Sequence, residues 1–156
     1  MAYVALGANL GAPIETVKQA VEALNALPSS TVVAVSSLYR TAPVGLHDQP
    51  DFINAVAALE TELMPLALLE ELFSIEARFG RQRSVRNAPR TLDLDLLLHG
   101  NTISDDPQVT LPHPRMHERA FVLMPLHEIA PALSIPGHCA VADLLPACAD
   151  QGIVKL

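Results

Sequence analysis

The sequence predicts an α+β fold in which strands and helices share one core. Segments with a strand-like apolar pattern and segments with helical spacing follow one another in the order β-α-β-β-α-β. The chain has 156 residues, of which 50% are hydrophobic and 17% charged, a composition typical of a globular domain that can bury a core. No internal repeat or low-complexity tract appears, so we expect a single domain over residues 1–156.

The first half of the chain contains a strand, a helix and two further strands. Residues 2–7, AYVALG, form a short apolar run that ends in the turn-like sequence GANLGAP, which predicts a buried strand. A helix follows, because Pro13 suits a first helical turn and apolar residues recur at helical spacing until Pro28: Ile14, Val17, Val21, Leu24 and Leu27. Residues 31–39 are rich in β-branched side chains, and residues 52–61 alternate with Phe52, Asn54, Val56 and Ala58 on one face, so both segments are predicted strands.

The second half begins with a helix predicted from Pro65 to Gly80. Its stripe consists of Leu69, Leu72, Phe73, Glu76 and Phe79, so Glu76 is a carboxylate in an apolar position and needs an arginine or a ligand as its partner. After the next strand, Pro114 opens a short helix that Pro125 limits, and residues 141–148 predict a further helical turn or two. This order is the split βαβ arrangement of ferredoxin-like folds, and flanking helices make it an α/β/α sandwich.

The stretch RTLDLDLLLHG, residues 90–100, places two carboxylates in an otherwise apolar strand. Because side chains alternate along a strand, Thr91, Asp93 and Asp95 share one face while the leucines Leu92, Leu94 and Leu96 share the other. Like charges this close repel, and a divalent cation, an arginine or proton sharing relieves the repulsion. A solvated face with salt bridges is the simpler interpretation. The functional one is Mg²⁺, held by the carboxylates together with substrate phosphates.

Arginines gather on both sides of this strand although the formal net charge is -7. Only Lys18 and Lys155 are lysines, and seven arginines fall in two windows: Arg78, Arg81, Arg83, Arg86 and Arg90, then Arg115 and Arg119. Guanidinium groups match phosphate oxygens in pairs, so we expect a compact polyanion as ligand, with solvated salt bridges as the alternative. The acidic total argues against nucleic-acid binding, and no G-x-x-x-x-G-K-[ST] motif is present, which excludes a P-loop enzyme.

Other features exclude further classes. His113 and His117 can share a helix face, but no third metal ligand is evident near them. Cys139 and Cys148 are too few for a disulfide framework, so we expect thiols. Charges or prolines interrupt every apolar run before the roughly 20 residues of a membrane span, and the N-terminus lacks a leader pattern. We expect a cytoplasmic monomer without membrane or nucleic-acid partners.

The segment RNAPRTLDLDLL, residues 86–97, resembles the signature of the 6-hydroxymethyl-7,8-dihydropterin pyrophosphokinase family of folate biosynthesis. Four more segments support the resemblance, in order between Val4 and about Pro131: ALGANLG, SSLYRTAPVGLHDQPDFINAV, IEARFGR and LPHPRMHERAFVLMPLHEIAP. It implies the monofunctional form, which transfers the β,γ-pyrophosphoryl group of ATP to the hydroxyl of 6-hydroxymethyl-7,8-dihydropterin and releases AMP.

The resemblance also implies roles for individual residues. Asp93 and Asp95 match the ligands of two Mg²⁺ ions bound with ATP, and the catalytic positions are Arg81, Arg90, Asp93 and Asp95. The implied ATP-binding residues are Glu76, Arg83, Arg90, Leu96, Thr110, His113 and Arg119. The implied pterin-binding residues are Thr41, Ala42, Pro43, Val44, Phe52, Asn54, Asp93 and Phe121. Asn87, Gln108 and Pro114 differ from the residues that some family members carry.

Two other functions compete with this one. A magnesium-dependent nucleotidyltransferase also places D-x-D on a strand, but it directs attack at the α-phosphorus and releases pyrophosphate. A regulatory module of ferredoxin-like fold binds a small ligand without chemistry. Such a module has no need of the aspartate pair and both arginine groups together.

Overall fold

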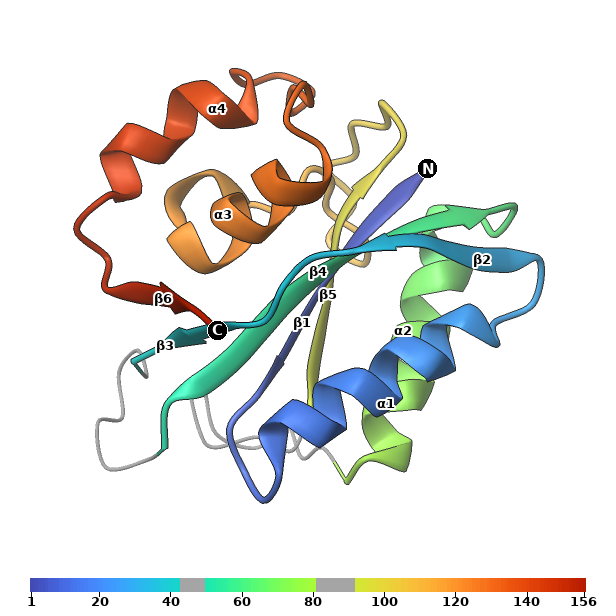
Figure 1. Ribbon diagram of the computed structural model, residues 1–156. Coiled ribbons are helices and arrows are strands. Elements are labelled where there is room, and N and C mark those ends of the chain that lie inside the picture. The colour runs from blue at the N-terminus through green and yellow to red at the C-terminus, as the bar shows by residue number, and fades with distance from the viewer. Residues whose placement is uncertain (43–49, 81–91) are drawn as a thin grey trace.

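The structure is a computed structural model that describes residues 1–42, 50–80 and 92–156. One antiparallel sheet lies between two layers of helices (Figure 1). Its strands are β1 (Ala2–Ala8), β2 (Ser30–Val35), β3 (Tyr39–Thr41), β4 (Phe52–Thr61), β5 (Asp93–His99) and β6 (Ile153–Lys155). They lie in the order β5-β1-β4-β3-β6, and β2 pairs with residues 57–61, the C-terminal half of β4. The predicted α+β class is confirmed.

The two faces of the sheet bury different cores. Helices α1 (Pro13–Asn25) and α2 (Pro65–Arg78) cover one face, where alternate residues of β1 and β4 meet Leu24, Leu68 and Leu72. The other face carries α3 (Ala120–Ile129), α4 (Val141–Leu144) and the 3₁₀ turns η1 (Met116–Glu118) and η2 (Leu145–Cys148). Their core includes Val56, Leu97 and Leu123. This second layer covers only part of its face, and the candidate site lies beside it.

The predicted strand over residues 31–39 is in fact two strands, β2 and β3, separated by residues 36–38. Polar side chains interrupt the ladder there. The backbone N–H of Ser37 donates to Glu128 Oε2 at 2.8 Å, and Val56 N donates to Ser36 Oγ at 2.9 Å. Side chains that bond to nearby backbone groups compete with strand pairing in this way.

The prediction that Pro125 limits a helix is wrong, because Pro125 lies inside α3. A proline at this place removes one intrahelical hydrogen bond. Burial compensates for the loss, because Pro125 is buried and its neighbours Val122, Leu123 and Leu126 pack into the second core. The C-terminal strand β6, which pairs with β3, was not predicted at all.

The predicted stripe of α2 is confirmed at Leu72 and Glu76, while Leu69 and Phe79 are only partly buried against the first core. The buried residues are Leu68, Leu72, Ile75 and Glu76, whereas Phe73 is 43% exposed. In α1 the predicted core residue Ile14 is also exposed. Both free thiols are as expected, Cys139 at the surface and Cys148 buried.

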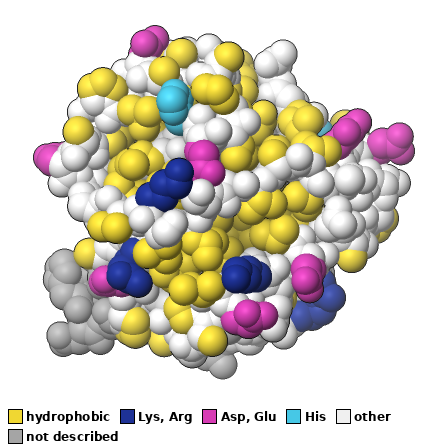
Figure 2. Space-filling model, in the orientation of Figure 1, with side chains coloured by type: hydrophobic (Ala, Val, Ile, Leu, Met, Phe, Trp, Pro, Cys, Tyr) yellow, Lys and Arg dark blue, Asp and Glu magenta, His cyan; other side chains and the backbone are white. Residues whose placement is uncertain are grey.

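Some apolar side chains remain at the surface. Figure 2 shows hydrophobic side chains gathered in the middle of one face of the molecule. Val33 and Val35 of β2 and Val154 of β6 are among the exposed large hydrophobic residues. Within the described ranges, no helix has the length and apolar character needed to cross a lipid bilayer.

Candidate active site

The aspartate pair lies on β5 as the alternation predicts. Leu94 and Leu96 point into the first core, while Asp93 and Asp95 are half-buried on the opposite face. The pairing of β5 with β1 shifts register between Tyr3 and Val4, and beyond this irregularity both Leu97 and Leu98 pack into the second core. Leucines therefore anchor β5 in both cores, and the N-terminal half of the strand carries the two carboxylates.

Glu76 supports β5 from beneath. Its side chain is only 1% exposed, and Oε2 accepts a hydrogen bond from Leu94 N at 2.8 Å. One partner of Glu76 is thus the backbone amide between the two aspartates, a kind of partner that was not predicted from the sequence. Glu76 is absent from the linings of both cavities found among the described residues, so its geometry is that of a support for the strand.

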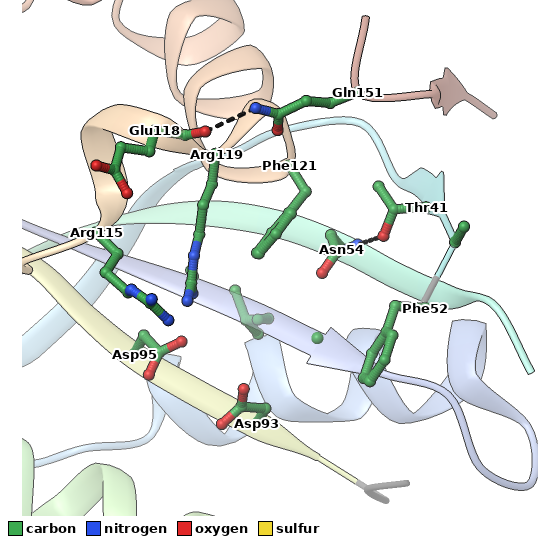
Figure 3. A pocket seen from close by; sticks show the side chains of 14 residues that line it. Thr41, Phe52, Asn54, Asp93, Asp95, Arg115, Glu118, Arg119, Phe121 and Gln151 are labelled. Atoms are coloured by element: carbon green, nitrogen blue, oxygen red, sulfur yellow. Dashed lines mark hydrogen bonds between the residues drawn. The ribbon is translucent and has the colours of Figure 1, made fainter. Parts of the chain in front are cut away.

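A first cavity of about 320 Å³ opens above Asp93 and Asp95 (Figure 3). Phe52 and Phe121 lie on either side of it, and Asn54 of β4 and Thr41 of β3 lie between them. The complete lining is Ala5, Leu6, Gly7, Thr41, Ala42, Phe52, Asn54, Asp93, Asp95, Arg115, Glu118, Arg119, Phe121 and Gln151. Two rings with amide and hydroxyl groups between them suit a flat, polar heterocycle.

The amide of Asn54 is fixed in orientation. Its Nδ2 donates to Thr41 Oγ1 at 2.8 Å, and both residues are buried. Gly7 allows this placement, because a Cβ at that position would lie 3.0 Å from Asn54 Oδ1. The carbonyl oxygen of the Asn54 amide is therefore held beside β1 at the cavity wall.

Two arginines, Arg115 and Arg119, extend from the η1 region toward the carboxylates of β5 (Figure 3). Burial lowers the pKa of Arg119, and the negative charge of Asp95 opposes that shift. The Arg119 guanidinium carbon also lies 5.4 Å from the ring centre of Phe121. Arg119 thus lies between the aromatic wall and the carboxylates.

His113 is held as a neutral imidazole. Burial and the positive charge of Arg119 together lower its pKa to about 4, against the opposing effect of Asp93. The backbone N–H of Arg115 donates to His113 Nδ1 at 3.2 Å, so the ring proton belongs on Nε2. His113 N donates to Leu97 O at 2.9 Å, which ties this segment to β5.

A second cavity of about 250 Å³ lies on the other side of Asp95. Its lining is Leu69, Phe73, Leu94, Asp95, Leu96, Gln108, Val109, Thr110, Leu111, His113 and Pro114. The predicted ATP-binding residues Leu96, Thr110 and His113 come together here. Asp95 belongs to both linings, so the acidic pair lies where the two cavities meet.

Several predicted residues lie outside the described ranges: Arg81, Arg83 and Arg90 in 81–91, and Pro43 and Val44 in 43–49. Sequence reasoning did not place Glu118, Gln151, Leu69 or Phe73 in the site, and named Arg115 only as part of a basic group. Leu69 and Phe73 lie on α2 beside its buried residues, and both line the second cavity. Nothing in the local sequence singles out Gln151.

Two cavities that meet at an acidic pair, with arginine side chains beside it, are typical of an enzyme that transfers phosphate groups between small molecules. Residues 3–131 match the family described as 7,8-dihydro-6-hydroxymethylpterin-pyrophosphokinase (HPPK). The chain belongs to this family.

Individual relatives agree with the family match. The chain is 49% identical to the 2-amino-4-hydroxy-6-hydroxymethyldihydropteridine pyrophosphokinase of Pseudomonas aeruginosa, covering 99% of this chain and 95% of the relative. It is 47% identical to the protein of the same name from Haemophilus influenzae, covering 99% and 97%. A crystal structure of an HPPK-DHPS protein in complex with substrates has the same fold, with a TM-score of 0.76 at 13% identity over 99% of this chain and 46% of that one.

Proposed function

We propose that this protein transfers the β,γ-pyrophosphoryl group of ATP to the hydroxyl of 6-hydroxymethyl-7,8-dihydropterin and releases AMP. The position of the aspartate pair carries the proposal, because Asp95 lines both cavities and the reacting groups of two substrates would meet beside it. The family and the names of its relatives support the same reaction.

The first cavity suits the pterin. Phe52 and Phe121 offer ring faces, and the orientation of the Asn54 amide presents a carbonyl oxygen to donors at the edge of the heterocycle. Thr41 and Ala42 lie at the end of β3 beside it. A pterin bound there has its hydroxymethyl group free to face the carboxylates at the other end of the cavity.

The second cavity suits the nucleotide. Leu69, Phe73 and Leu96 provide apolar contacts, while Thr110 and His113 add polar groups to the lining. A neutral His113 can donate one hydrogen bond from Nε2 to a phosphate oxygen without adding a charge. Arg119 and Arg115 supply positive charge on the pterin side, and Arg81, Arg83 and Arg90 are proposed to add more.

The donor set fits magnesium. Asp93 and Asp95 offer the hard carboxylate oxygens that Mg²⁺ prefers. Mg²⁺ is typically bound by one or two carboxylates, with substrate phosphates and water in the remaining positions. We propose that the two aspartates hold two Mg²⁺ ions, which neutralise phosphate charge when bound.

Side chains of the protein contribute to catalysis by positioning the substrates and by stabilising charge. The cavities orient the hydroxyl toward the triphosphate, which converts an encounter in solution into a reaction between aligned groups. The arginines stabilise the charge that spreads over the transferred oxygens. Positioning and charge compensation therefore account for catalysis without an assigned general base.

Product identification tests the proposal. Incubation with γ-labelled ATP, magnesium and the hydroxymethyldihydropterin should deliver the label to the pterin, with unlabelled AMP in equal amount. Label in free pyrophosphate with a nucleotide attached to the acceptor would establish a nucleotidyltransferase, and stoichiometric ADP an ordinary kinase. Absence of any ATP turnover would favour a binding module.

We further propose that the protein acts as a cytoplasmic monomer. The frequent charges in its apolar runs and its two free thiols support this location. Sedimentation at several concentrations would test the monomer, and cell fractionation the location.

A further inference from the structure

Gln151 reaches back from the C-terminal segment to the backbone on both sides of Arg119. Its Nε2 donates to Glu118 O at 2.8 Å (Figure 3), and Ala120 N donates to its Oε1 at 2.9 Å. One side chain thus bonds to the residue before Arg119 and to the residue after it. The carboxamide also lies at the rim of the first cavity.

The bond to Ala120 has a clear physical reason. Ala120 is the first residue of α3 and is only 1% exposed, and a helix gives its first amides no internal partner. The cap residue Arg119 provides no side-chain cap of its own, since its guanidinium extends toward Asp95. Gln151 therefore satisfies a buried amide and leaves the Arg119 side chain available to the site.

Gln151 is itself held on both sides. Gln151 N donates to Cys148 O at 3.1 Å, and Cys148 is buried in the second core. Two residues further on, β6 begins and pairs with β3, the strand that carries Thr41. The C-terminal segment thus connects the strand that lines one side of the cavity to the turn that carries Arg119.

We propose that Gln151 is a positioning residue for Arg119: it fixes the backbone on either side of that arginine, so that the guanidinium is aimed at the phosphates beside Asp95. The inference rests on the proposed function. A purely structural cap would stabilise α3 in the same way, but it would not couple to Arg119 in catalysis. The two roles therefore differ in a measurable way.

The test uses Gln151→Met, which keeps the side-chain length but removes both hydrogen bonds, and Asp150→Asn as the matched control at the neighbouring exposed position. We expect Gln151→Met to lower kcat by about tenfold with a smaller change in the KM for the pterin. Asp150→Asn should leave kcat unchanged. In an Arg119→Ala background, Gln151→Met should have less than about a twofold further effect, because the residue that it positions is gone.

A second measurement needs no substrate. ¹⁵N relaxation should show larger amplitudes for Arg119 N and Nε in Gln151→Met than in the wild type or in Asp150→Asn. The inference would be overturned if Gln151→Met lowered kcat by the same factor in the Arg119→Ala background as in the wild type. Unchanged relaxation of Arg119 in Gln151→Met would overturn it as well. Relaxation is measured on the free protein, so it tests the role of Gln151 independently of the reaction. If the wild type formed no AMP, that result would overturn the proposed function but not the role of Gln151.

Discussion

Asp93 and Asp95 lie on one face of β5, and two carboxylates in such a position repel unless positive charge lies beside them. If they hold magnesium with ATP, Asp93→Asn or Asp95→Asn should lower kcat by about 10²-fold or more, roughly 2.7 kcal/mol of barrier. Steady-state kinetics checks this. Asp105→Asn, an exposed carboxylate outside both cavities, is the control. Near-normal turnover in either site variant, with an unchanged melting temperature, would refute the metal assignment.

The bond between Asn54 and Thr41 predicts a change in affinity rather than in rate. Thr41→Val removes the acceptor of Asn54 Nδ2 while keeping the shape of the side chain. A lost hydrogen bond of about 1 kcal/mol corresponds to roughly fivefold weaker pterin binding. Calorimetric titration measures it. Thr41→Ser keeps the hydroxyl and should bind as the wild type does, and equal weakening in both variants would show that the methyl group, not the hydrogen bond, matters.

His113 predicts a pH dependence. Its folded pKa of about 4 lies below the ordinary 6.5, so between these values the unfolded chain binds a proton that the folded chain does not. The contribution of His113 to stability is therefore constant above pH 6.5 and falls as the pH decreases toward 4. NMR titration should place the His113 midpoint near pH 4, with the signal assigned by its loss in His113→Gln. A midpoint near 6.5 would contradict the buried, neutral imidazole.

At the scale of elements, Glu128 of α3 holds the connection between β2 and β3. Its carboxylate accepts from Ser37 N, from Ser37 Oγ and, at 2.6 Å, from the hydroxyl of the buried Tyr39. Glu128→Ala leaves these donors unpaired and should lower the free energy of unfolding by about 1–3 kcal/mol. Urea denaturation measures it. In a Tyr39→Phe background the loss should be smaller, and an equal loss would show that the Tyr39 bond contributes nothing.

The same elements show what a sequence can and cannot predict. Apolar runs predicted β1, β4 and β5, most of whose residues are buried, and helical spacing predicted α1 and α2. The break between β2 and β3 depends on Glu128, 91 residues away from Ser37, and the local pattern contains no trace of it. Likewise Pro125 lies buried inside α3 and β6 pairs with β3, and the local sequence pattern indicates neither.

At the scale of the whole molecule, one face of the sheet is packed against helices and the other face carries the candidate site. One face is sealed by α1 and α2, with Glu76 bonded to the backbone of β5, and the other presents Asp93 and Asp95 between two cavities. The aspartates, Phe52, Asn54 and His113 could be predicted as site residues from motifs. Gln151 could not, because its place at the cavity follows from the docking of the C-terminal segment rather than from any local pattern.

The central claim is that this arrangement directs the pterin hydroxyl at the β-phosphorus of ATP. The most direct measurement uses hydroxymethyldihydropterin carrying ¹⁸O in its hydroxyl, with ³¹P NMR of the products. Attack at the β-phosphorus predicts an isotope shift on the phosphorus bonded to the pterin within an intact diphosphate, with AMP free of label. An isotope shift on a phosphorus that carries adenosine, or on a lone phosphoryl group attached to the pterin, would contradict the account.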